Sequence, residues 1–120
     1  MEKGIGAVVT PMNPLYKRDE LLYQLNASNS KAYIYHEDFR SEAESAALKY
    51  GKIEHMIMMG SGEQNMFTDA SMNSNSTIVD FERLRTSELD ASIIQNIKIN
   101  SKDNLLLPFS SGTTGFPKGV

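Results

Sequence analysis

Short apolar runs alternate with amphipathic stretches over the first half of the chain. Runs rich in β-branched, aromatic or methionine residues predict strands at residues 5–10, 31–35 and 53–59. Between these runs, leucines share one helical face in residues 19–26, and alanines with Tyr50 share one face in residues 41–50. Strands and helices that alternate in this way are typical of a parallel sheet with crossover helices. The pattern therefore predicts an α/β fold with residues 4–60 as its core.

The second predicted helix carries signals at both of its ends. Ser41 and Glu44 have the Ser-x-x-Glu spacing of a capping box, which predicts the start of the helix. Gly51 follows the last periodic residue and is predicted to be the C-terminal cap.

The pattern weakens after the third predicted strand. Residues 60–76 are small, polar and without periodicity, which predicts a flexible surface loop. The Gly60-Ser61-Gly62 triplet follows a strand as a phosphate loop would, but the rest of a dinucleotide-binding motif is missing. Further on, we expect a short edge strand at residues 77–79 and one helical turn at 81–85, directly after Asp80. A connecting segment is expected at 86–104, followed by a last strand at 104–109.

Composition narrows the classes of function. The chain has 120 residues and a net charge of −3, with its basic residues scattered, which argues against a nucleic-acid or anionic-membrane partner. The absence of cysteine excludes disulfides, thiolate metal sites and a cysteine nucleophile. No apolar run is long enough to span a bilayer.

Histidine and methionine side chains offer weak candidates for metal sites. His36 and His55 lack the spacing of metal ligands, so a core or edge histidine is the favoured interpretation of His55. The three methionines of the third strand are interpreted as core side chains rather than soft metal ligands; they are Met56, Met58 and Met59.

The most distinctive stretch is SSGTTGFPKG, residues 110–119. Its hydroxyls come from Ser110, Ser111, Thr113 and Thr114, and its glycines are Gly112, Gly115 and Gly119. Glycines let successive backbone N–H groups turn toward an anion, and Lys118 adds a positive charge on a flexible stem. Such a loop suits a polyphosphate, and an ordinary glycine-rich hairpin loop is the alternative. It is not a Walker A loop, because Pro117 precedes Lys118 and a glycine follows it.

The order of these residues resembles the phosphate loop of the adenylate-forming enzymes. This superfamily includes acyl-CoA synthetases, 4-coumarate-CoA ligases, luciferases and the adenylation domains of peptide synthetases. The likeness covers residues 107–120, and it extends to GAVVTPMNPLY at residues 6–16 and to Lys102-Asp103. It is strongest to the 4-coumarate-CoA ligase and luciferase branch. Many relatives have Thr-Pro where this chain has Lys17-Arg18, which predicts a weaker start for the first helix.

The resemblance implies a fold and an activity. The chain would be an incomplete piece of the large N-terminal domain, a partial parallel sheet with flanking helices over residues 1–120, in which residues 104–120 form a strand and the phosphate-binding loop. The family uses ATP with Mg²⁺ to activate a small carboxylic acid as an acyl-adenylate, which is then transferred to coenzyme A. The residues implied to hold the ATP phosphates are Ser110, Ser111, Gly112, Thr113, Thr114, Gly115 and Lys118. No catalytic residue or metal ligand is assigned to this chain.

The position of the motif at the end of the chain adds further expectations. The chain is expected to be a fragment that is inactive alone, with the returning strand of the loop hairpin beginning only at Val120. Lys118 is then expected to be exposed, without a buried acidic partner. The alternative is a non-catalytic truncated product with at most weak binding of nucleotide phosphates. The expected compartment is the cytoplasm, or the peroxisome if a full-length C-terminus carries that signal.

Overall fold

The computed structural model describes residues 5–60, 77–88, 92, 95–110 and 115–120. The chain divides into two compact units. One is contiguous, Met12–Ser87, and the other combines Met1–Pro11 with Glu88–Val120. The predicted flexible loop at 60–76 lies outside the described residues except for Gly60.

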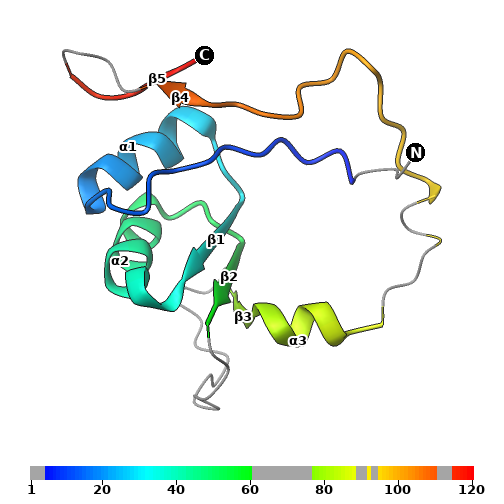
Figure 1. Cartoon of the computed structure of the whole chain (residues 1–120), viewed down its shortest axis with the longest axis horizontal. Coiled ribbons are helices and arrows are strands. Elements are labelled where there is room, and N and C mark those ends of the chain that lie inside the picture. Colours follow the sequence, from blue (N-terminus) through cyan, green and yellow to red (C-terminus); the bar gives the residue numbers. More distant parts are fainter. Residues whose placement is uncertain (1–4, 61–76, 89–91, 93–94, 111–114) are drawn as a thin grey trace. The chain divides into compact units, whose positions relative to one another are not determined.

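The contiguous unit is built on a three-stranded parallel sheet (Figure 1). Its strands are β1 (Ala32–His36), β2 (His55–Met59) and β3 (Thr77–Asp80), in the order β1-β2-β3. In this register Ile34, Ile57 and Val79 lie side by side across the sheet. The α/β class with a partial parallel sheet and flanking helices is confirmed.

The membership of the sheet differs from the prediction in one strand. The segment Ile5–Thr10 was predicted to be one of the parallel strands of the sheet, together with 31–35 and 53–59, but the third strand is β3, the predicted short edge strand. Residues 5–10 make one isolated parallel bridge, from Val9 to Leu106. The prediction was wrong here because apolar character shows that a segment favours extended structure without showing which partner it pairs with.

In the described part of this unit the α-helices are α1 (Arg18–Ser28), α2 (Arg40–Tyr50) and α3 (Phe81–Thr86). The buried faces of α1 and α2 and the buried side chains of the sheet form one apolar core. Its members are Leu21, Leu25, Tyr35, Ala43, Ala46, Ala47, Tyr50, Ile53, Met56, Met58 and Ile78. The predicted helical faces are therefore confirmed.

Neighbouring side chains along β2 alternate between its two faces, so the three methionines predicted to lie in the core are not all buried. Met56 and Met58 are buried as expected, whereas Met59 is exposed because neighbouring strand residues point to opposite faces. His55 is exposed at the first residue of β2, so it is not a core histidine.

The predicted capping box of α2 does not form. The helix begins one residue earlier, at Arg40, after a short 3₁₀ turn at Glu37–Phe39. Glu44 instead accepts hydrogen bonds from the Tyr35 hydroxyl (2.9 Å) and from Arg40 Nε (2.8 Å). Burial, reinforced by the hydrogen bond to Glu44, raises the pKa of Tyr35 above its usual range. The carboxylate thus links α2 to β1 through Tyr35 and does not cap the helix N-terminus.

A carboxylate from α2 completes the start of α1. Lys17, the residue before this helix, supplies no side-chain cap, in line with the weak start expected from the sequence. Glu20 accepts a hydrogen bond from the backbone N–H of Lys17 (2.9 Å), and Glu42 of α2 accepts one from the backbone N–H of Arg18 (3.0 Å). Two N–H groups at the start of α1 are thereby satisfied.

Gly51 ends α2 as the sequence predicted. Its φ of 72° lies in the left-handed region, and its N–H donates to the carbonyl of Ala47 (2.9 Å). We expect Gly51→Ala to lower the free energy of unfolding by about 1 kcal/mol, because alanine is strained at positive φ. Urea denaturation followed by circular dichroism measures the change. Ser45→Ala, at an exposed position of the same helix, is the control and should change stability by less than about 0.5 kcal/mol; equal effects would contradict the assignment.

The end of the contiguous unit also follows the prediction. β3 passes directly into α3, and Asp80 caps the helix by accepting the N–H of Arg83 (3.1 Å). Among the residues that the structure describes, no helix has both the length and the apolar character needed to cross a membrane.

Candidate functional site

The candidate phosphate loop follows a short extended segment. Leu106 pairs with Val9 in a parallel bridge, held by hydrogen bonds from Val9 N–H to the Leu105 carbonyl (3.0 Å) and from Leu107 N–H to the Val9 carbonyl (2.8 Å). The strand predicted at 104–109 is thus divided into this bridge and strand β4 (Phe109–Ser110). Pro108 lies between the two parts and has no N–H to donate to a ladder.

The loop is closed by an antiparallel hairpin (Figure 1). Strand β4 pairs with β5 (Lys118–Gly119), with Phe109 opposite Gly119 and Ser110 opposite Lys118. The N–H of Val120 donates to the carbonyl of Pro108 (2.9 Å) and extends the pairing. The returning strand therefore begins at Lys118, and the expectation that it begins only at Val120 was wrong. That expectation assigned Lys118 and Gly119 to the loop, whereas the ladder includes them.

Two predicted site residues form the base of the hairpin. Ser110 and Lys118 are both exposed, and the Ser110 hydroxyl makes a long contact of 3.5 Å to the Lys118 carbonyl. The ion pairs between described residues do not include Lys118. Four further predicted residues lie outside the described residues: Ser111, Gly112, Thr113 and Thr114.

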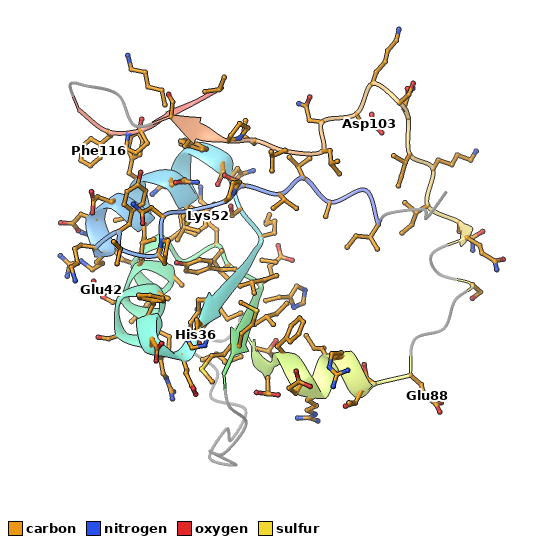
Figure 2. All side chains as sticks on the ribbon, in the orientation of Figure 1. His36, Glu42, Lys52, Glu88, Asp103 and Phe116 are labelled. Carbon is orange, nitrogen blue, oxygen red and sulfur yellow. The ribbon has the colours of Figure 1, made fainter. Side chains whose placement is uncertain are left out.

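Residues 115–117, which lead into β5, include a backbone conformation that favours glycine, as expected of a tight loop. Gly115 has a φ of 101°, and no atom lies within 4 Å of the place a Cβ would take. The glycine is therefore required by its conformation and not by lack of space. Phe116 is exposed in this segment (Figure 2), and Pro117 is buried immediately before Lys118. Proline has no N–H, so its burial leaves no donor unsatisfied.

The chemistry of this site suits an anion. An exposed ammonium group and a hydroxyl stand at the base of a loop whose sequence is rich in small residues. Lys118 provides a point charge with three donors, which can bind phosphate oxygens from several directions. The described residues contain no group of three histidine, aspartate or glutamate side chains that could hold a metal ion.

Comparison with known proteins places the chain in a family. A family model described as "AMP-binding enzyme" matches residues 4–120. The chain belongs to the AMP-binding enzyme family. The resemblance inferred from the loop sequence is therefore confirmed.

Several similar curated proteins are 4-coumarate–CoA ligases of plants. The chain is 33% identical over 116 residues to 4-coumarate–CoA ligase 3 of Arabidopsis thaliana, covering 97% of this chain and 18% of that protein. It is 34% identical over 116 residues to 4-coumarate–CoA ligase CCL1 of Humulus lupulus, covering 97% of this chain and 19% of that protein. The chain thus spans about a fifth of the length of these relatives.

A solved structure supports the fold assignment. The anthranilate CoA ligase AuaEII, in complex with anthranoyl-AMP, superposes with a TM-score of 0.58 at 24% sequence identity. The match covers 96% of this chain and 20% of that chain. At this level of identity the likeness concerns the fold of the AMP-binding family.

Sequence reasoning missed three residues that take part in the pairing of the segments on either side of the loop. Val9 pairs with the segment before the hairpin, and Phe109 and Gly119 face each other across it. The spacing of Phe109 and Gly119 on either side of the loop was visible in the sequence, but nothing in it marked them as partners.

Proposed function

We propose that this chain is part of an ATP-dependent carboxylic acid–CoA ligase and supplies the loop that holds the ATP phosphates. The observation that carries the proposal is the register of the β4–β5 hairpin, which sets Ser110 opposite Lys118 at the base of the loop. The printed names of the relatives, 4-coumarate–CoA ligases, and the anthranoyl-AMP bound to the similar structure support it. On this proposal residues 1–120 belong to the N-terminal domain, with the α/β core at 4–60, the loop at 60–76 and the strand and phosphate loop at 104–120.

The proposed chemistry has two steps. A carboxylate oxygen attacks the α-phosphorus of ATP, and the bond to pyrophosphate breaks to give an acyl-adenylate. The thiolate of coenzyme A then attacks the acyl carbon and releases AMP. Pyrophosphate gains charge as it leaves, and an ammonium group with positioned donors stabilises that charge. In this proposal Lys118 and the hydroxyl of Ser110 bind the β- and γ-phosphates together with Ser111, Gly112, Thr113, Thr114 and Gly115.

Magnesium would reach the site with the nucleotide. Because the described residues include no group of three metal-ligating side chains, we assign no metal ligand to them. Mg²⁺ would supply charge neutralisation on the phosphates. The role derived for the chain itself is to orient the phosphates.

Binding of ATP tests the role of the loop. We expect the purified chain to give a saturable shift of the ³¹P signals of the β- and γ-phosphates at low ionic strength. Lys118→Ala should weaken this binding at least about tenfold, because a hydrogen bond to a charged group contributes about 1.5–3 kcal/mol. The titration should be followed at two salt concentrations, since exposed charges are screened.

Lys102→Ala is the matched control for this experiment. Lys102 is an exposed lysine in the same unit but outside the hairpin, so its removal changes net charge equally. Equal weakening by both substitutions would mean that ATP responds only to overall charge. That result, or the absence of any saturable shift with the unmodified chain, would overturn the proposed function.

A further inference from the structure

We propose that Phe109 and Gly119 are positioning residues, which fix the hairpin register that holds Ser110 and Lys118 opposite each other. Neither residue belongs to the group assigned above to the phosphates. The inference rests on the proposed function, because it concerns how the loop is presented to ATP.

The evidence is a close contact across the hairpin. Phe109 and Gly119 are partners in the β4–β5 ladder. A Cβ at Gly119 would lie 3.4 Å from Cζ of the Phe109 ring and 3.7 Å from both Cε atoms. The ring therefore lies over the backbone of the glycine and occupies the space where a larger side chain would extend.

This arrangement accounts for the two residue types. Glycine lacks a side chain to pack within a strand, and an aromatic ring on the opposite strand covers the exposed backbone in its place. The half-buried Phe109 ring thus provides the cross-strand contact of this pair. An alanine at 119 would touch the ring at ordinary van der Waals distance, whereas the γ-carbons of a valine would displace it.

The register decides which way Lys118 points. Residues opposite each other in an antiparallel pair project to the same side of the ladder, and neighbours along a strand project to opposite sides. Ser110 and Lys118 therefore share one side, and Phe109 and Gly119 share the other. A slip of one residue would move Lys118 to the side away from Ser110. Among the described residues the β4–β5 register has two pairs, and Phe109–Gly119 is one of them.

The first test removes the ring and then restores it. We expect Phe109→Leu to weaken ATP binding by the chain up to about fivefold, the change expected when a cross-strand aromatic contact is lost. Phe109→Tyr retains the ring and should restore binding. Phe81→Leu makes the same chemical change in α3, outside the hairpin, and should leave binding unchanged.

A spectroscopic measurement separates this inference from the proposed function. A ring over Gly119 should shift its α-proton resonances upfield in the unmodified chain and in Phe109→Tyr, but not in Phe109→Leu. An ordinary Gly119 shift in the unmodified chain, or ATP binding unaffected by Phe109→Leu, would overturn the positioning role while leaving the proposed function standing. Absence of ATP binding by the unmodified chain would overturn both.

A second pair of variants keeps the inference testable if Phe109→Leu does not fold. Gly119→Ala should retain ATP binding and the ring contact, whereas Gly119→Val should weaken binding at least as much as Phe109→Leu. Equal binding by the alanine and valine variants would contradict the packing argument.

Discussion

We expect the purified 120-residue chain to give no exchange of labelled pyrophosphate into ATP with any of a panel of carboxylic acids. The chain contains the phosphate loop and no other active-site motif of the family, and it spans about a fifth of its relatives. Holding the phosphates without orienting the acid forfeits the advantage of proximity, which amounts to about 7–11 kcal/mol. Exchange assays with Mg²⁺, run beside an intact 4-coumarate–CoA ligase as positive control, measure this.

Lys118→Ala provides the background for the exchange assay. If the unmodified chain exchanged pyrophosphate above the level of this variant, the loop would be catalysing adenylation without the remaining parts of the family's site. The prediction of no exchange would then be wrong, and the carboxylic acid would have to bind to this chain itself.

The second large effect concerns the core of the contiguous unit. Leu25 on α1 is 0% exposed and belongs to the cluster that joins α1 and α2 to the sheet. We expect Leu25→Ala to reduce the free energy of unfolding by about 2–5 kcal/mol, because truncation loses buried apolar surface and leaves a cavity. Since small proteins are stable by only about 5–15 kcal/mol, this change should be visible as a large fall in the urea midpoint.

Leu48→Ala is the control for the core variant. Leu48 is 54% exposed on α2, so the same truncation in a helix removes little buried surface. Leucine and alanine have similar helix propensities, which leaves burial as the main difference between the two positions. Equal destabilisation by the two variants would contradict the assignment of Leu25 to the core.

The helices were the best predicted part of the fold. The spacing of Ala43, Ala46, Ala47 and Tyr50 predicted the buried face of α2, and Gly51 predicted its end. Both signals are local, because a helix face and a C-cap are determined by residues within a few positions of each other.

Features that depend on distant residues were not predictable. The apolar run at 5–10 suggested a strand of the main sheet, but its described pairing is the single bridge between Val9 and Leu106. Glu44 had the spacing of a capping residue and instead accepts a hydrogen bond from the Tyr35 hydroxyl of β1. In both cases a tertiary contact outcompeted a local preference.

Part of the candidate site was also predictable from local sequence, and part of it was not. The order of serines, threonines, glycines and Lys118 predicted the chemistry of the loop and the family. The hairpin register was not visible in the sequence, because it depends on contacts between Phe109 and Gly119 and between Val120 and Pro108 across the loop.

The division of the chain into two units has a consequence for biosynthesis. The described strands and helices of the contiguous unit, and the core that they form, all lie within Met12–Ser87, so they can assemble once that stretch has left the ribosome. Val9, in contrast, can pair with Leu106 only after about a hundred further residues have been translated. Until then the apolar segment Ile5–Thr10 lacks the bridge to Leu106, so chaperones or other nascent chains can bind it. Ribosome-stalled chains that end before Leu105 should therefore leave this segment accessible to protease after the contiguous unit has become resistant.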